Sequence, residues 1–138
     1  MLEQAEILRE IKTKNAYVRK LANGIVTMHH PLDVSNSTMS NFVENYQAIL
    51  QIQRGEITPF LINTGNVVNI GRDAKKYMTE KLPTIASSMA MVSEAQSPLV
   101  IYTINVYLNV FTPKIPHKFF NKEKEGYNWL LQQLNMQD

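Results

Sequence analysis

The chain has 138 residues, 44% of them hydrophobic and 19% charged, so it is long enough for one domain with a core of its own and too hydrophobic to be disordered. The formal net charge of +2 is too small to indicate nucleic-acid binding. The absence of cysteine excludes a disulfide framework, a thiolate metal site and a cysteine nucleophile.

The amino-terminal residues carry charges where a signal peptide would be apolar, and no stretch approaches the ~20 apolar residues of a membrane span. We therefore expect a single domain over residues 1–138 in the cytoplasm, with residues 1–14 as an amino-terminal extension. No internal repeat or linker divides the chain.

The extension has two competing patterns. Leu2 and Leu8 would share a helical face, whereas Ile7 and Ile11 alternate as in a strand. We predict a short helix over residues 2–12.

A β-hairpin is predicted next. Two strand-like runs, 16–20 and 25–29, flank Asn23 and Gly24. Asn-Gly between such runs is a strong hairpin signal, because both residues tolerate positive φ. Pro31 then ends the second strand.

A long helix follows, with Ser35, Asn36 and Ser37 as N-cap candidates and Gly55 suited to its end. Its apolar residues recur at helical spacing, at Phe42, Val43, Tyr46, Ile49 and Leu50.

Residues 57–82 form the unit around which the rest is arranged. An apolar run at 59–62 predicts a buried strand, and residues 72–81 predict a short helix that Pro83 closes. The loop between them would lie at the strand's carboxyl end, where open α/β sheets place ligand or partner contacts.

The remaining elements alternate. We predict a strand over 85–92, a helix over 97–111, a strand over 117–120 and a last helix capped by Asn121, in which Gly126 weakens the helix by up to ~1 kcal/mol against Ala. This order predicts an α/β fold, with a mixed, mostly parallel sheet, an amino-terminal β-hairpin and about four helices.

Several segments occur in an order that resembles a known family. They are NGIVTMHH, PFLINTGNVVNIGRDAKKYM, MAMVSEAQSPLV, FTPKIPHKFFN and EGYNWL, and together they span roughly four-fifths of the chain. In this order they are similar to small, uncharacterised bacterial STAS/SEC14-like domains. The resemblance implies the fold of STAS anti-sigma-factor antagonists and, more distantly, of SEC14-type lipid carriers.

The chain departs from the phosphorylatable members of that family. STAS antagonists have Asp-Ser-Ser or Asp-Ser-Gly at the start of the helix after the central strand, whereas residues 69–73 of this chain contain no serine or threonine. Gly71 stands where similar domains often have a serine. Phosphorylation at the usual position is therefore not expected; Thr64 and Thr79 are nearby but lie outside the motif.

The loop from Gly65 to Gly71 has two interpretations. The helix start and Arg72 could bind an anion, but we favour a turn that needs its glycines and a helix that Asn69 caps. We expect the surface around it to bind a protein partner, through Val67, Asn69, Gly71, Arg72, Lys75 and Tyr77.

The helix over 97–111 is apolar on almost every side, so it needs a cover on both faces. It could be plain core, a homodimer face or the wall of an apolar ligand pocket, and we favour core plus partner face. The residues that would form this face or pocket are Leu99, Tyr102, Val106, Tyr107 and Val110.

No pattern indicates catalysis or a metal site. His29 and His30 are adjacent and would point to opposite faces of a strand, and no serine lies in a nucleophile-elbow motif. We predict a non-enzymatic, dimeric STAS-like regulatory module with no cofactor. A small carrier of an apolar or amphipathic ligand is the alternative, and an enzyme using His117 with a distant carboxylate is a weaker one.

Overall fold

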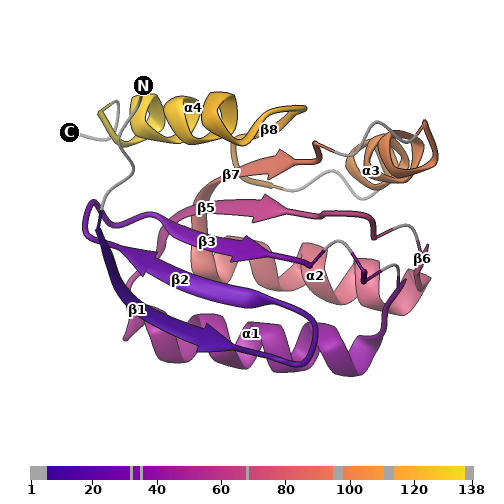
Figure 1. Cartoon of the computed structure of the whole chain (residues 1–138), viewed down its shortest axis with the longest axis horizontal. Coiled ribbons are helices and arrows are strands. Elements are labelled where there is room, and N and C mark those ends of the chain that lie inside the picture. Colours follow the sequence, from indigo (N-terminus) through magenta and orange to yellow (C-terminus); the bar gives the residue numbers. More distant parts are fainter. Residues whose placement is uncertain are drawn as a thin grey trace.

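Six strands form one sheet, in the spatial order β1 (Ile7–Lys12), β2 (Tyr17–Leu21), β3 (Val26–His29), β5 (Thr58–Asn63), β7 (Ala86–Val92) and β8 (His117–Phe120) (Figure 1). The computed structural model describes residues 6–31, 33–34, 36–67, 69–94, 98–110 and 114–135. Strands β1, β2 and β3 pair antiparallel, and β3, β5, β7 and β8 pair parallel. The predicted sheet, with an amino-terminal hairpin on a mostly parallel remainder, is confirmed.

Helices cover both faces of this sheet. One face packs against α1 (Met39–Gln53), α2 (Arg72–Ile85) and α3 (Pro98–Val110), and the other packs against α4 (Glu123–Asn135). Figure 1 shows α4 on one side of the sheet and α1 and α2 on the other. Among the described residues, no helix is long and apolar enough to cross a membrane.

The central strand β5 belongs to both cores. Phe60 and Ile62 point into the larger core with α1, α2 and α3, while Leu61 points into the smaller core with α4. All three side chains are at most 2% exposed. This period-two alternation of fully buried residues is typical of a strand covered on both faces.

A second, two-stranded sheet was not predicted. It consists of β4 (Asn36–Ser37) and β6 (Asn69–Ile70), paired parallel. Asn36 and Ser37 are therefore not the N-cap of α1; Thr38 is, in a capping box with Asn41. Ser35 lies outside the described residues.

The predicted helix over residues 2–12 is wrong where the structure describes it, because residues 7–12 form β1. Pairing with β2 decides the conformation: Ile11 packs on the larger core, and the Arg9 guanidinium donates to the Ile52 carbonyl at 2.7 Å. A tertiary environment therefore overrides a weak local helix pattern.

Pro83 does not close α2, which continues to Ile85. Leu82 and Ile85 are buried at 1% and 3% exposure and hold the last turn against the sheet. The lost backbone hydrogen bond is confined to one position near the helix end, where packing offsets it.

Gly126 has a packing role that the sequence did not indicate. A Cβ atom at this position would lie 2.9 Å from Val92 Cγ2 and 3.3 Å from Ala90 Cβ, both on β7. The glycine therefore lets α4 approach β7 closely, and its low helix propensity is a secondary effect.

Replacing Gly126 with Ala should lower the free energy of unfolding by about 1–2 kcal/mol, because overpacking outweighs a gain in helix propensity of up to about 1 kcal/mol. Urea unfolding measures this. Gln132→Ala is the control, because Gln132 is exposed on the same helix, and it should change the value by less than about 0.5 kcal/mol. A Gly126→Ala protein as stable as the wild type would contradict the close approach.

Candidate functional site

The carboxyl ends of β3, β5 and β7 lie at one edge of the sheet. Figure 1 shows these three strands pointing the same way, toward the end of the molecule where α1 and α2 begin and β6 lies. Open α/β sheets bind ligands and partners at this edge. The small β4–β6 sheet joins the segments that lead into the two helices.

An open groove runs between the starts of α1 and α2. Thr38 and Met39 border it on one side, and Gly71, Arg72 and Asp73 on the other. Thr38 caps α1, whereas Gly71 is the N-cap of α2 and gives it no side-chain hydrogen bond. The α2 end of this groove therefore presents backbone N–H groups that no capping side chain occupies.

The predicted partner-binding residues divide between surface and interior. Gly71 and Arg72 are exposed in the groove, as predicted for a surface. Val67 is only 3% exposed and Lys75 is half-buried; both line a cavity beneath the groove. The expectation that Val67 lies on the surface is wrong, because its side chain faces the core of the site.

Tyr77 and Asn69 belong to neither group. Tyr77 is half-buried, and its ring packs edge-on against Tyr46 of α1 with the ring centroids 5.9 Å apart. It therefore joins α1 to α2 and does not form an open contact surface. The backbone of Asn69 forms β6, but its side chain lies outside the described residues.

The cavity has a volume of about 40 Å³. It lies under α3 at the carboxyl ends of the parallel strands. Most of its wall is apolar, from Phe42, Ile62, Met78, Met91 and Ile104. Its polar groups are on His30, Ser37, Thr64, Lys75, Thr103 and Tyr107.

His30 is held neutral in the wall of this cavity. Burial lowers its pKa below the ordinary 6.5; a hydrogen bond to the Asn63 backbone opposes this, and the neighbouring His29 adds to it. The Asn63 carbonyl can only accept, so His30 Nδ1 carries the proton and donates at 3.0 Å. In the neutral ring, Nε2 is then an acceptor.

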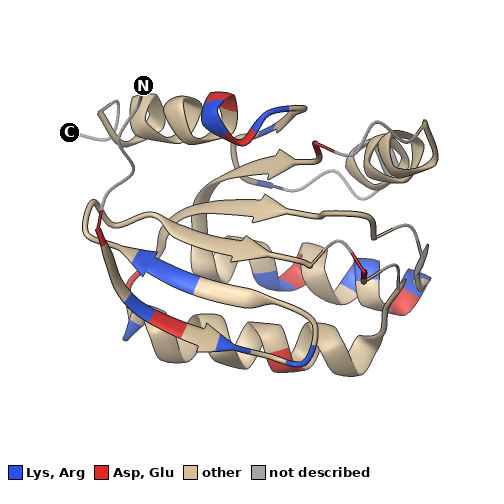
Figure 2. Ribbon diagram, in the orientation of Figure 1, with Lys and Arg blue, Asp and Glu red and all other residues tan. Residues whose placement is uncertain are grey.

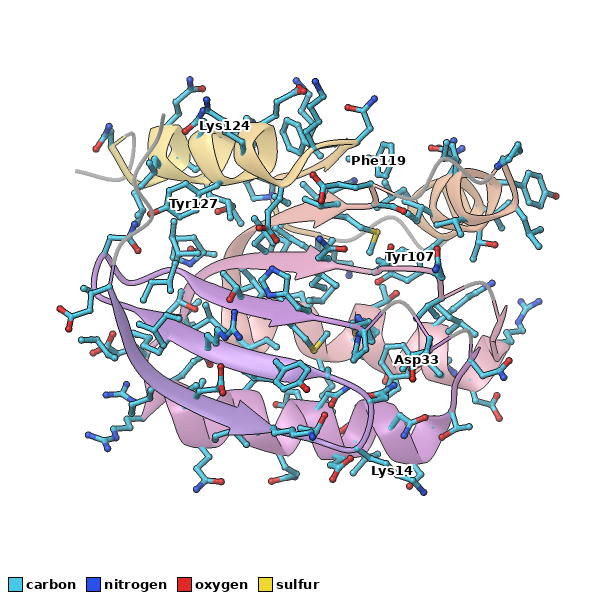
Figure 3. The ribbon with its side chains drawn as sticks, in the orientation of Figure 1. Lys14, Asp33, Tyr107, Phe119, Lys124 and Tyr127 are labelled. Carbon is cyan, nitrogen blue, oxygen red and sulfur yellow. The ribbon has the colours of Figure 1, made fainter. Side chains whose placement is uncertain are left out.

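The residues of the predicted apolar face of α3 also differ in exposure, some lying on the surface and one in the interior. Leu99 and Tyr102 are 58% and 66% exposed, and Val106 is half-buried. Tyr107 is buried and lies between α3 and the end of β5 (Figure 3), where burial raises its pKa above 10 and a hydrogen bond with Thr79 partly opposes the shift. The side chain of Val110 lies outside the described residues.

The two threonines near the missing phosphorylation motif are already engaged. Thr64 Oγ1 donates to the Val92 carbonyl at 3.3 Å, and Thr79 Oγ1 donates to the Lys75 carbonyl at 2.9 Å. Thr64 is 8% exposed and Thr79 is half-buried. Neither hydroxyl is presented to solvent as a modifying enzyme would require.

On the opposite face of the sheet, His29 pairs with Glu123 at the start of α4. Asn63 Nδ2 also donates to Glu123 Oε1, at 3.4 Å. His29 Nδ1 is buried and has no hydrogen-bond partner in the described part of the chain. The pair joins β3 to α4 and was not predicted, since 94 residues separate its members.

The third histidine has a local role. His117 Nδ1 donates to the Ile115 carbonyl, two residues earlier, at 2.8 Å. This contact orients the ring toward its own loop and offers no support for a pairing with a distant carboxylate. Within the described ranges, no group of three or more His, Cys, Asp or Glu residues could hold a metal ion.

Sequence reasoning missed His30 as a site residue. The available signal was its position directly after a strand, because carboxyl ends of parallel strands meet at one edge. Thr103 and Ile104 were missed because a helix that is apolar all round gives no sequence indication of which side faces the interior.

The arrangement is similar to a solved structure. An uncharacterised protein of the DUF3478 family from Shewanella loihica PV-4, described as having a SpoIIAA-like fold, matches 94% of this chain and 97% of its own, with a TM-score of 0.56 and 13% identity. At this identity the likeness shows the fold alone. The chain has a SpoIIAA-like, that is STAS-like, α/β fold.

The family follows from the sequence. The model of a domain of unknown function, DUF7793, matches residues 19–134, and the chain belongs to that family. The match begins within β2 and ends within α4, so it covers the cavity and the groove. No curated protein sequence matches the chain.

The folded protein should lose stability as the pH falls below about 6.5. The pKa of His30 is lower in the folded than in the unfolded chain, so in this window the unfolded chain binds more protons. Proton binding then stabilises the unfolded chain relative to the folded one. Urea unfolding at about pH 7.5 and about pH 5.5 should show the loss, and His30→Asn should reduce it. The loss should persist in His117→Asn; an unchanged pH dependence in His30→Asn would contradict the assignment.

Proposed function

We propose that the chain is a non-enzymatic, STAS-like regulatory module that binds a protein partner through the groove between α1 and α2. The observation that carries this proposal is the start of α2, where an uncapped helix end and the exposed Arg72 border an open surface. Free backbone N–H groups and a positive charge together favour an acidic side chain or another anionic group on the partner.

The SpoIIAA-like fold supports a regulatory module in a general way only, because fold does not imply function. The missing serine in residues 69–73, together with the engaged hydroxyls of Thr64 and Thr79, supports control that does not use phosphorylation of this loop. Partner binding would then be constitutive or controlled in another way.

The size of the cavity disfavours a lipid carrier. Pockets that hold drug-sized or larger ligands measure roughly 300–1,000 Å³. The cavity beneath α3 measures about 40 Å³. A phospholipid or long acyl chain would require the helices to separate, so the interaction module remains the better proposal.

We further propose that the chain forms a homodimer through α3. Figure 2 shows no blue or red segment on α3, so this helix contains no Lys, Arg, Asp or Glu, and its outer face exposes Leu99 and Tyr102. An uncharged apolar face can meet its own copy without like-charge repulsion, as a two-fold interface requires.

Arg72→Glu should reduce recovery of the partner in a pull-down at least tenfold, because it places a negative charge at the helix end that attracts anions. The matched control is Lys124→Glu, which makes the same change in formal charge at an exposed position on α4, on the opposite face of the sheet (Figure 3). Quantitative mass spectrometry identifies proteins lost with the first variant and kept with the second. Equal recovery with both variants would count against this surface.

Light scattering at high micromolar concentration should give the mass of two chains for the wild type. Tyr102→Glu should shift the protein to monomer, since it would place a charge in the α3 interface, and Lys124→Glu should leave the dimer intact. A wild-type protein with the mass of one chain would end the dimer proposal.

A further inference from the structure

Lys75 is a partly buried charge without a partner. It is half-buried on α2 and makes no ion pair, hydrogen bond or ring contact with its ammonium group in the described part of the chain. Solvent can hydrate the ammonium group of a half-buried lysine in the free protein. Without an internal partner, this group is also free to pair with an anion from outside the chain.

The other basic side chains confirm how unusual Lys75 is. Each remaining Lys or Arg that is described and not fully exposed has a partner. These contacts are Arg9 with the Ile52 carbonyl, Arg19 with Glu10, Lys20 with Glu56, and Lys81 over the rings of Tyr46 and Tyr77. Lys75 is the exception, and it is the one that lines the cavity.

The residues of the cavity wall that the structure describes do not balance this charge, because they include no aspartate or glutamate. His30, the other basic side chain, is kept neutral by burial, which lowers its pKa. Among the described residues of the wall, Lys75 is therefore the only positive charge, and none carries a negative charge.

The rest of the wall favours an apolar group. Thr64 and Thr103 use their hydroxyls on the backbone carbonyls of Val92 and Leu99, and Tyr107 is hydrogen-bonded to Thr79. Ser37 Oγ accepts from Asn15 Nδ2, and His30 Nδ1 donates to the Asn63 carbonyl. The remaining surface comes from apolar side chains: Phe42, Ile62, Val67, Ile70, Met78, Met91 and Ile104. The cavity therefore offers an apolar interior and one cationic group.

Size limits the ligand. The cavity measures about 40 Å³, roughly three times the space that one ordered water needs. The end of an apolar tail, about two carbon atoms, fits this space on the scale of a cavity of about 150 Å³ that holds benzene. An anionic head can lie beside the half-buried Lys75, which solvent still reaches.

We propose that the cavity is a binding site for a short-chain monocarboxylate, with the carboxylate paired to Lys75 Nζ and the tail between Met78, Met91 and Ile104. The carboxylate supplies the negative charge that the described wall lacks, and the tail displaces water from the apolar part of the wall. The site does not depend on whether Arg72 contacts a protein partner.

NMR titration of the amide signals tests this with propionate, butyrate, octanoate and butyramide as probes. Propionate and butyrate should cause saturable shifts at Thr64, Lys75 and Ile104, with a Kd of about 0.1–10 mM, as expected for ligands of so few atoms. Butyramide, which has the same shape without the charge, should bind at least tenfold more weakly. Octanoate should bind no tighter than butyrate.

Two variants separate the role of Lys75 from general charge effects. Lys75→Met, which keeps the length and apolar stem, should weaken butyrate binding at least tenfold, whereas Lys76→Met at the next, exposed position should leave it unchanged. Because Lys75→Met removes an unpaired charge, its Tm in the absence of ligand should equal or exceed that of the wild type, which shows that the variant is folded.

Three results would overturn the proposal. They are the absence of saturable shifts with propionate and butyrate, equal butyrate affinity in Lys75→Met and the wild type, or octanoate binding far tighter than butyrate. The last result would indicate a longer acyl chain, and so a carrier whose helices separate around its ligand.

Discussion

The burial of β5 on both faces is the constraint on which the rest of the structure depends. Phe60 and Ile62 meet α1, α2 and α3 on one side, and Leu61 meets α4 on the other. The neighbouring strands β3 and β7 run parallel to β5, and parallel strands need crossovers. The crossover helices α1, α2 and α3 cover one face of the sheet, and α4, which follows the last strand, covers the other. The carboxyl end of β5 then meets those of β3 and β7 at one edge.

The site follows from that edge. His30 follows the carboxyl end of β3, and Thr64 follows that of β5. Because these strands are neighbours, both residues line the same cavity as Lys75 near the start of α2. A neutral histidine, an unpaired lysine and an apolar wall form one small cavity, while Gly71 and Arg72 remain outside in the groove. Lys75 and Arg72 lie one turn apart on α2, so a ligand and a partner could each act on the same helix end.

The sequence predicted the fold well where the pattern is local. The Asn-Gly hairpin, the apolar run of β5 and the existence of α1 each result from backbone preferences or period, and all three are confirmed. The predicted apolar face of α1 is wrong in part, because Val43 and Leu50 are 38% and 39% exposed and the buried face turns toward Asn45, Ala48 and Ile52 instead. The prediction failed where long-range contacts decide the local structure. Residues 7–12 form a strand because they pair with β2, and position 126 needs a glycine because β7 lies close to α4 there. For the site, the sequence located the loop and α2 but not which side chains point inward, because Val67 and Tyr107 are distinguished from Arg72 and Tyr102 only by packing.

Native-state amide hydrogen exchange measures the central claim most directly, since it gives an opening free energy for each strand separately. The account predicts that the amides of β5 exchange only by global unfolding, with a free energy equal to that from urea unfolding, and that those of the edge strand β1 open at lower free energy. Amides of β5 that exchange at a lower free energy than those of β1 would contradict the view that the doubly buried strand organises the sheet and its site.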